Sequence, residues 1–446
     1  MRVWIVNPFD NLPLEGTRPQ RYWLMARAFA RAGHDVVLWT SDFSHARKAK
    51  RVFVGEGMAE RIPDSGFQIS DPGGVISDPG GGISGRCGFR LVLVPTPGYP
   101  RNVCLRRIWS HRAFARRWRA MAEGEPAPDV LVASLPPLAL GTAALAYRAA
   151  HPGVRLVVDV QDAWPETFEQ VAPRWLLVPL RRVAGRIYRG ADAITGVAER
   201  YVALARSYGA TAPMDVFPLG IEMPARFMRT GDRCAPEEVE PRTGDRCAPE
   251  EEEARAGGRR TTQVCGADGR TLRLAYAGTM GTSYDLGTLV DVVKGGADLA
   301  LDLAGTGPDE ARLRARAGDC PRIRFHGYLG EDALRALLAS GDAGVIPTYD
   351  ASCVGVPGKL ADYLAAGLPA LNALHGETER LLAEHGAGFT YQAGDAASLR
   401  DAVARLRAAD RTTLRAGAAA LATRFDADRV YGGYAAWVEA HVVASA

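Results

Sequence analysis

Short apolar runs of strand length alternate with helical patterns along both halves of this 446-residue sequence, which predicts βαβ units and parallel sheets. In the first half the predicted strands are Val3–Val6, Asp35–Thr40, Arg90–Pro95, Val130–Ser134, Leu156–Val160, Ala193–Gly196 and Met214–Pro218. In the second half they are Leu272–Tyr276, Leu299–Ala304, Ile323–His326, Gly344–Pro347, Pro369–Asn372 and Gly388–Tyr391. Because the chain is too long for one ordinary core, we predict an α/β protein with two doubly wound, Rossmann-like domains.

A long polar stretch sets the predicted domain boundaries. Residues 1–223 form the first domain, 224–269 a linker and 270–424 the second domain, and we expect a helix at 425–446 to pack back on the first. Within the linker, RTGDRCAPEE at 229–238 returns at 242–251, and in the first domain ISDPGG at 69–74 returns at 76–81. Such repeats cannot bury a core, so both are predicted to be flexible inserts, with a functional role left open.

Charge and cysteine content indicate which partners, metal sites and cellular compartment to expect. The net charge of +3 argues neither for nor against nucleic acid, and we expect none as a partner. The seven cysteines lack metal-ligand spacing, which predicts free thiols in a reducing compartment and no metal site. Asp426 and Asp428 form a D-x-D that we interpret as a helix cap. The N-terminal apolar run is too short for a signal peptide, and no 18-residue apolar run is present, so we expect a cytoplasmic protein.

The stretch 347–369, PTYDASCVGVPGKLADYLAAGLP, combines a strand end, a glycine-bearing loop and a short helix. Unpaired backbone N–H groups converge at such a helix N-terminus and hold anions. Gly355 and Gly358 allow a ligand to approach the backbone closely, and Lys359 adds a positive charge suited to phosphate. Asp362 lies on the same helical face, where it could accept hydrogen bonds from sugar hydroxyls. These residues predict a clamp for a nucleotide diphosphate.

Three glycine-rich pieces precede this clamp, and each ends a predicted strand at its carboxyl end. They are 276–282 (YAGTMGT), 303–308 (LAGTGP) and 325–328 (FHGY). Ligands bind at the carboxyl ends of strands in open α/β sheets, so three such pieces in one domain indicate a ligand site. The candidate donor-binding residues here are Gly278, Thr279, Gly305, Gly307, Gly327 and Tyr328.

The order and spacing of GTMG, LAGTGPD, RFHGYL and KLADYLAAGLP resemble the nucleotide-sugar domain of GT-B glycosyltransferases, specifically retaining family 4. In the first half, EGTRPQRYWLMARAFARAGHDVVLWTSDFSHARK (15–48) and DVQDAWPETF (159–168) resemble bacterial surface-polysaccharide transferases. The resemblance covers most of the chain apart from the duplicated inserts. It implies two domains facing a cleft, a UDP-sugar donor, a lipid-linked saccharide acceptor in capsule or O-antigen assembly, and no metal or other cofactor. It also leaves open whether a hexosyl or an N-acetylhexosaminyl group is transferred.

Two positions depart from the family pattern. Family 4 commonly has two glutamates seven residues apart around this loop; the second falls on Asp362, but the first falls on Val354. We expect backbone groups of 353–356 to substitute for the missing acid. Family members also place cations after the first glycine-rich piece, and 278–286 has none. The resemblance therefore assigns diphosphate stabilisation to Lys359, the helix N-terminus and Arg18, and adds Pro347, Ser352, Gly355 and Val356 to the donor site.

The first half has no G-x-G-x-x-G after its first strand, which argues against a dinucleotide coenzyme. Instead Gly16, Thr17 and Arg18 precede a helix predicted to begin at Pro19, where they could face the donor phosphate. His45 follows the second strand and either contacts the acceptor or holds its own loop.

Asp162 falls where family members often have an acid near the acceptor. Trp164 accompanies it on the acceptor side, and the histidine that often precedes the acid is Gln161 here. The competing interpretation is that Asp162 caps the following helix.

Residues 101–121 contain seven arginines and no carboxylate. On a helix, Phe114 and Trp118 share one face with Met121, while Arg112, Arg116 and Arg119 lie opposite. This pattern fits a core face backed by a solvated face, and it also fits a helix that lies on anionic lipid. Residues 173–182 are similar, so we expect peripheral contact with the inner face of the plasma membrane.

The sequence favours a retaining glycosyltransferase over three alternatives. A nucleotide-sugar 2-epimerase shares the two-domain architecture and remains open. A degenerate domain that only binds nucleotide sugars also remains open, because Val354 and the missing cations leave the site incomplete. An NAD-dependent dehydrogenase is disfavoured by the absent fingerprint.

Overall fold

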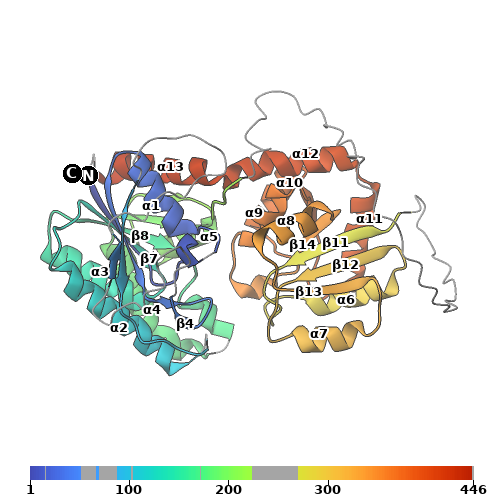
Figure 1. Cartoon of the computed structure of the whole chain (residues 1–446), viewed down its shortest axis with the longest axis horizontal. Coiled ribbons are helices and arrows are strands. Elements are labelled where there is room, and N and C mark those ends of the chain that lie inside the picture. Colours follow the sequence, from blue (N-terminus) through green and yellow to red (C-terminus); the bar gives the residue numbers. More distant parts are fainter. Residues whose placement is uncertain are drawn as a thin grey trace, which may run out of the picture.

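The computed structural model describes residues 1–15, 17–51, 67–69, 88–101, 104–170, 172–223 and 270–443, with backbone only for 67–69, 170 and 443. Figure 1 shows two lobes that the C-terminal helices join along the upper side. Three parts of the sequence analysed above lie outside the described residues: Gly16, residues 70–81 of the first duplication, and the whole linker 224–269, which contains the second duplication. Within the described part of the chain, no helix is long and apolar enough to cross a bilayer.

The first domain is built on an eight-stranded sheet with the order β10-β9-β8-β7-β1-β2-β6-β5. Its strands are β1 (Arg2–Val6), β2 (Asp35–Ser41), β5 (Phe67–Ile69), β6 (Arg90–Val94), β7 (Val130–Leu135), β8 (Arg155–Val160), β9 (Ala193–Gly196) and β10 (Met214–Val216). All neighbours pair in parallel except β5, which runs antiparallel to β6. A separate ribbon pairs β3 (Phe43–Ser44) with β4 (Ala49–Lys50). The strand order reverses between β1 and β7, which is where such sheets bind ligands.

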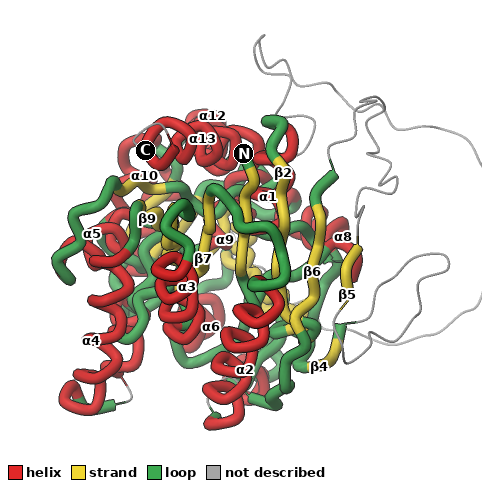
Figure 2. Tube along the Cα trace, turned by 90° about the vertical axis from the view of Figure 1, so that its left-hand side faces the viewer, coloured by secondary structure: helices red, strands yellow, loops and turns green. Residues whose placement is uncertain are grey.

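Helices cover both faces of this sheet because its strands are apolar on both sides. They are α1 (Arg21–Arg31), α2 (Leu105–Ala122), α3 (Leu138–Ala150), α4 (Arg174–Gly190) and α5 (Glu199–Ser207), with the short turns η1 (Pro13–Glu15) and η2 (Glu166–Gln170). Alternate residues of β1 point to opposite faces: Trp4 belongs to the core with α2, α3 and α4, and Ile5 to the core with α1. Figure 2 shows α2, α3 and α4 side by side on one face. On α2, Phe114 and Trp118 are fully buried while Arg112 and Arg116 are exposed, as the helical pattern predicts.

The second domain has a six-stranded parallel sheet with the order β13-β12-β11-β14-β15-β16, which reverses between β11 and β14. Its strands are β11 (Leu272–Ala277), β12 (Leu299–Ala304), β13 (Ile323–Gly327), β14 (Ala343–Ile346), β15 (Ala370–Asn372) and β16 (Gly388–Thr390). The helices are α6 (Leu286–Gly295), α7 (Glu310–Ala317), α8 (Glu331–Ala339), α9 (Gly358–Ala365), α10 (Glu377–His385), α11 (Ala396–Ala408) and α12 (Arg411–Ala422), with η4 (Asp350–Ser352) before α9. After η5 (Thr423–Phe425), α13 (Ala427–Val438) and η6 (Glu439–Val443) return to the first domain.

The predicted fold class is confirmed, and every predicted strand is present. The predicted start of the first helix was wrong by two residues: α1 begins at Arg21, because Gln20 still has extended backbone angles. Sequence reasoning did not predict β5 or the β3–β4 ribbon, which are only two or three residues long. Asp426 is the N-cap of α13, as predicted, and accepts a hydrogen bond from the backbone N–H of Arg429 at 2.9 Å.

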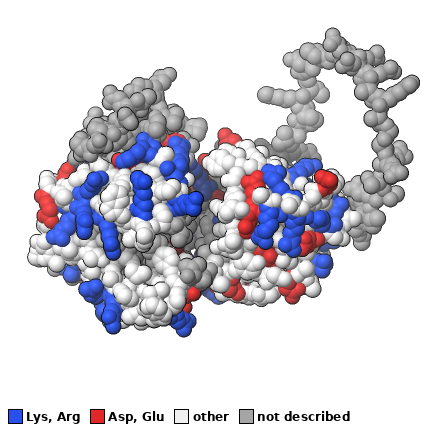
Figure 3. Space-filling model, turned by 90° about the horizontal axis from the view of Figure 1, so that it is seen from below, with Lys and Arg blue, Asp and Glu red and all other residues white. Residues whose placement is uncertain are grey.

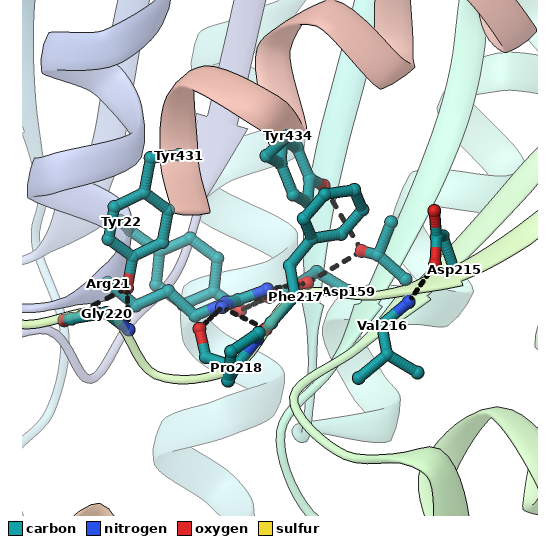
Figure 4. Close-up of polar contacts among 11 residues, drawn as sticks. Arg21, Tyr22, Asp159, Asp215, Val216, Phe217, Pro218, Gly220, Tyr431 and Tyr434 are labelled. Atoms are coloured by element: carbon teal, nitrogen blue, oxygen red, sulfur yellow. Dashed lines mark hydrogen bonds and ion pairs between the residues drawn. The ribbon is translucent and has the colours of Figure 1, made fainter. Parts of the chain in front are cut away.

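A buried ion pair lies where the C-terminal helix α13 packs against the first domain (Figure 4). Arg21 of α1 donates to both carboxylate oxygens of Asp159 on β8, at 2.8 and 2.7 Å, and both side chains are almost fully buried. Asp159 also accepts from the hydroxyls of Tyr22 and Thr195, at 2.7 Å each. The Arg21 guanidinium donates to the carbonyls of the 217–218 segment and lies against the rings of Tyr431 and Tyr434. This network ties α1, β8, the segment after β10 and α13 together.

Candidate active site

The predicted clamp lies where the second sheet reverses its strand order. After β14 the chain passes through η4 and Cys353 to Pro357, the N-cap of α9. Cys353 has a φ of +59°, a left-handed conformation that is uncommon outside glycine. α9 begins at Gly358, so Lys359 stands in its first turn, as the sequence predicted.

The Lys359 side chain reaches the carboxyl end of β11. Its Nζ lies 3.2 Å from the hydroxyl oxygen of Tyr276, and 4.3 and 3.8 Å from the ring centroids of Tyr276 and Tyr284. A Cβ placed on Gly278 would lie 3.5 Å from the same Nζ. The ammonium is thus held by two aromatic rings next to the first glycine turn. Among the described residues it forms no ion pair.

Burial lowers the pKa of Lys359 from its usual 10.5 to about 7. The side chain therefore carries only part of its charge at neutral pH. An anion placed beside Nζ would favour the charged form and raise this pKa again. A buried lysine with a shifted pKa at the carboxyl end of a parallel sheet is a candidate for an anion-binding functional site.

Asp362 and Arg18 form an ion pair between the two domains. Arg18 Nη1 lies 2.5 Å from Asp362 Oδ1, and both side chains are partly exposed. Burial alone would lower the pKa of Arg18, but the Asp362 carboxylate outweighs it and raises that pKa. A partly exposed pair of this kind stabilises a fold by at most about 1 kcal/mol, so it can open to admit a ligand. Arg18 thus lies beside the clamp, where its partner in this structure is a carboxylate; contact with a diphosphate stays a prediction.

The loop before α9 packs against α5 of the first domain. Arg200 Nη1 donates to the carbonyl oxygen of Val354 at 3.0 Å. A Cβ on Gly355 would lie 2.4 Å from the Cβ of Ala198, and Val356 is buried. The sequence predicts a close approach of a ligand at Gly355, but in this structure the residue that approaches it closely is Ala198 of the neighbouring domain.

The glycine turns after β11, β12 and β13 pack directly on one another. A Cβ on Gly305 would lie 2.0 Å from the carbonyl oxygen of Gly278, and one on Gly307 would lie 2.2 Å from that of Met280. The backbone N–H of Gly305 donates to Gly327 at 2.6 Å. Gly305 and Gly307 are therefore required to stack the turns, and this stacking places the Gly278 turn beside Lys359.

We expect Gly305→Ala to destabilise the second domain by about 3 kcal/mol or more, because it adds a backbone clash to an unfavourable positive φ of 121°. Gly386→Ala is the matched control: Gly386 also has a positive φ, 59°, but its added Cβ meets nothing within 4 Å. The control should cost only about 1 to 2 kcal/mol. Urea unfolding followed by circular dichroism measures both changes, and equal costs would contradict the packing argument.

Six side chains gather at the carboxyl ends of the first sheet, and we call them the aromatic cluster: Phe9, His45, Tyr99, Arg107, His111 and Trp164. His45 Nδ1 lies 2.5 Å from the Tyr99 hydroxyl oxygen. Burial, helped by neighbouring cations, lowers the pKa of His45 to about 4 and that of His111 to about 3. Both imidazoles are therefore neutral at pH 7. Both alternatives for His45 stay open, because it holds its loop and also belongs to this cluster.

Asp162 organises the loop that carries Trp164. Its Oδ1 accepts from the backbone N–H of Ala163 at 2.8 Å and from the Thr167 hydroxyl at 3.1 Å, and its Oδ2 accepts from Trp164 Nε1 at 3.1 Å. Burial raises the pKa of Asp162 despite these hydrogen bonds. None of these contacts reaches the free backbone N–H groups of η2, which begins only at Glu166, so Asp162 orders its own turn and thereby fixes the position of Trp164.

The other predicted donor residues are divided between the loops of the two domains. Pro347 is buried directly after β14, and Ser352 Oγ accepts weakly from the N–H of Val354 at 3.4 Å. Thr279 and Tyr328 are exposed beyond β11 and β13. Thr17 bonds to the carbonyl of its own loop at 2.8 Å, and Gly16 is not described.

Sequence reasoning missed several residues of the site. Tyr276 and Tyr284 were not identified as the rings around Lys359, although Tyr276 stands two residues before the Gly278 turn. Phe9, Tyr99, Arg107 and His111 were not grouped with His45 and Trp164, because they come from separate loops and α2. No pattern within a single loop identifies such a cluster. Among the described residues, no group of three or more His, Cys, Asp or Glu side chains is placed to hold a metal ion.

Two family models match the chain, one to each domain. Residues 19–220 match the glycosyl transferase 4-like domain, and residues 273–408 match glycosyl transferases group 1. Together they cover well over half of the sequence. A search of curated protein sequences gave no match.

Solved structures of three glycosyl-transferring or sugar-nucleotide-binding proteins share the fold over nearly the whole chain. Sucrose-phosphate synthase from Thermosynechococcus elongatus has a TM-score of 0.64 at 14% identity and covers 100% of both chains. HepE of Anabaena, solved in complex with UDP, has a TM-score of 0.60 at 12% identity, covering 99% of this chain and 100% of the other. The lipopolysaccharide outer core galactosyltransferase WaaB has a TM-score of 0.55 at 9% identity, covering 98% and 100%. At these identities the likeness shows the fold alone.

Proposed function

The chain belongs to the GT-B glycosyltransferase superfamily, and from that premise we propose that it transfers a sugar from UDP to a lipid-linked saccharide with retention of configuration. The observation that carries the proposal is Lys359, a cation without an ion-pair partner among the described residues, held beside the Gly278 turn in the first turn of α9. Solved relatives with this fold hold UDP and UDP-glucose, which supports a UDP-linked donor. We further propose capsule or O-antigen assembly as the setting, with a hexosyl or N-acetylhexosaminyl group as the sugar, and the family resemblance supports this.

The proposed reaction depends on charge at the leaving group. The bond between C1 of the sugar and the diphosphate oxygen breaks through an oxocarbenium-like state, while an acceptor hydroxyl oxygen bonds to C1 from the same side. The acceptor proton passes to the departing phosphate oxygen, so UDP leaves with it. Lys359 and the free N–H groups of α9 stabilise the negative charge that grows on the diphosphate. We expect no metal or other cofactor to be required.

The ion pair between Arg18 and Asp362 gives the donor site two further groups. When a donor enters, Asp362 becomes available to the ribose hydroxyls, and Arg18 becomes available to the diphosphate. Arg18 then exchanges one anionic partner for another, and Asp362 accepts hydrogen bonds from the ribose hydroxyls in place of those from Arg18, which lowers the cost of opening the pair. Backbone groups of 353–356 take the place of the acid that is Val354 here.

The aromatic cluster is the proposed acceptor side. Its rings offer flat apolar surfaces, and Arg107 and neutral His45 offer hydrogen-bond donors and acceptors. Asp162 acts through Trp164 as a positioning residue. The cluster and Lys359 lie on different domains, so acceptor and donor would approach one another between them.

A transfer assay with radiolabelled UDP-sugars and a bacterial membrane lipid extract tests this function. We expect label to appear in the lipid fraction only when enzyme and extract are both present, and NMR of the product to show retained configuration. Acceptor-free conversion of UDP-N-acetylglucosamine to UDP-N-acetylmannosamine would instead identify a 2-epimerase. Tight binding of UDP-sugars without any turnover would identify a binding module, the alternative that Val354 motivates.

A further inference from the structure

The first turns of α2 and α4 expose large apolar side chains. Seven of the nine large apolar side chains that are exposed among the described residues lie on these two helices: Leu105, Ile108, Trp109, Trp175, Leu176, Val178 and Leu180. Leu105 is 84% exposed, Trp109 56% and Trp175 71%. Single exposed apolar residues need no explanation, but a group of this size marks a surface that contacts something other than water.

Both helices begin at the same end of the first domain. α2 follows β6 and α4 follows β8, and these strands are parallel, so both helices start at the carboxyl edge of the sheet. Figure 2 shows their lower ends projecting from the domain together. On α2, Leu105, Ile108 and Trp109 share one face at i, i+3 and i+4. Arg107 and His111 of the same helix belong to the aromatic cluster, so the exposed face and the acceptor side are two sides of one helix.

The charged side chains that α2 and α4 carry are all basic. Neither α2 nor α4 contains an acidic residue. Arg106, Arg112 and Arg182 are exposed and, within the described chain, have no ion-pair partner. The acidic residues that flank these helices are already paired: Glu123 with Arg119, and Glu166 and Glu169 with Arg181, which shares Glu169 with Arg174. Figure 3, a view from below, shows mainly blue side chains among white ones on the first domain, whereas the second domain mixes blue and red.

We propose that the first turns of α2 and α4 form a bilayer-docking face, which inserts its apolar side chains into the interface of an anionic membrane. Two tryptophans beside leucines, surrounded by unpaired arginines, match the composition of helices that lie in a bilayer interface. A second copy of this chain fits less well, because self-association would bring arginines of like charge together around the apolar centre. The membrane is therefore the occupant that both the apolar and the charged residues favour.

The docking face deepens the proposed function, and its role in delivering a lipid-linked acceptor rests on that function. A lipid-linked acceptor held in the membrane would present its saccharide next to the helix that carries Arg107 and His111. Docking would thus bring the acceptor to the aromatic cluster while the donor site stays in the aqueous phase. Vesicle binding itself needs neither donor nor transfer, so the two proposals fail separately.

Co-sedimentation with lipid vesicles tests the bilayer-docking face. The full chain should bind vesicles of phosphatidylcholine with 30% phosphatidylglycerol, a composition that we choose to supply about −30 to −50 mV of surface potential. It should bind much less to vesicles of phosphatidylcholine alone. Trp109→Ser with Trp175→Ser should lower the partition coefficient at least about tenfold. Each of Arg106→Ala, Arg112→Ala and Arg182→Ala should lower it about fivefold at low salt. Arg400→Ala, which removes an exposed arginine from α11 of the second domain and lies outside the donor site, is the control and should leave vesicle binding unchanged.

Two results would overturn the proposal. One is equal binding of the double tryptophan variant and the wild type, provided that both melt at the same temperature. The other is a wild-type dimer in sedimentation velocity that the tryptophan substitutions convert to monomer, with no vesicle binding, since that would assign the face to a second copy. UDP should raise the melting temperature equally in every variant, as measured in parallel by thermal shift. If UDP does not stabilise the wild type, that result counts against the proposed function and not against the docking face.

Discussion

Lys359→Met is expected to lower kcat for sugar transfer about 10²- to 10³-fold, the usual cost of removing one preorganised charge from a leaving group. Lys359 is the cation that the structure places at the first glycine turn, and methionine keeps the length of the side chain within its aromatic surroundings. Steady-state kinetics with a UDP-sugar and membrane acceptor measure the change. The effect should fall mainly on kcat, because the charge on the diphosphate grows as the bond breaks.

A stability measurement separates lost chemistry from lost structure. The pKa of Lys359 is about 7 in the folded chain and 10.5 ordinarily, so burying the charged form costs folding free energy at every pH below 10.5. That cost is complete below pH 7 and disappears as the pH rises from 7 to 10.5. Lys359→Met should therefore raise the free energy of unfolding at pH 7 even though it lowers kcat.

Lys294→Met is the matched control for this substitution. Lys294 lies on α6 in an exposed position and donates to the carbonyl of Arg316 at 2.6 Å, so its replacement should leave kcat unchanged. Unchanged transfer in Lys359→Met would contradict the assignment of the leaving-group cation.

Asp159→Asn is expected to destabilise the first domain by about 3 to 5 kcal/mol, because it leaves the Arg21 guanidinium buried without a counter-charge. The loss should also loosen α13, since Arg21 contacts Tyr431 and Tyr434 across the same network. Urea unfolding followed by tryptophan fluorescence measures the change.

A double substitution and a surface control sharpen this test. Arg21→Met with Asp159→Leu removes both charges and should recover most of the lost stability. Asp35→Asn breaks the exposed pair with Arg2, at 2.7 Å, and should cost no more than about 1 kcal/mol. A cost for Asp159→Asn as small as that of the surface control would show that the buried pair does not hold the domain together.

The fold could be predicted from the sequence because its signal is local and repeated. Each strand, such as β1 with Val3 to Val6, is a short apolar run between helical patterns, and the order of these runs along the chain determines a doubly wound sheet. The return of the last helix to the first domain was expected from the way such domain pairs are commonly tied together, since aromatic residues such as Tyr431 and Tyr434 indicate burial but not the partner domain. The short β3–β4 ribbon was not, because two-residue strands have no period to detect.

The site was only partly predictable, since its residues meet through tertiary structure. The glycine turn and Lys359 are local motifs, so the sequence located them. The pairing of Arg18 with Asp362 spans two domains, and the contact between Gly355 and Ala198 depends on how the domains pack. A glycine looks the same in sequence whether it approaches a ligand or another backbone, which is why Gly305 and Gly307 were interpreted as ligand contacts alone.

Proton uptake on UDP binding tests the central claim most directly. Calorimetric titration at pH 8 in two buffers with different ionisation enthalpies gives the number of protons that binding takes up. Free Lys359, with a pKa of about 7, is mostly neutral at pH 8, and a diphosphate beside Nζ would restore its charge. We predict uptake of about one proton in the wild type and none in Lys359→Met. UDP binding without proton uptake, or with the same uptake in both proteins, would show that the diphosphate does not lie on Lys359.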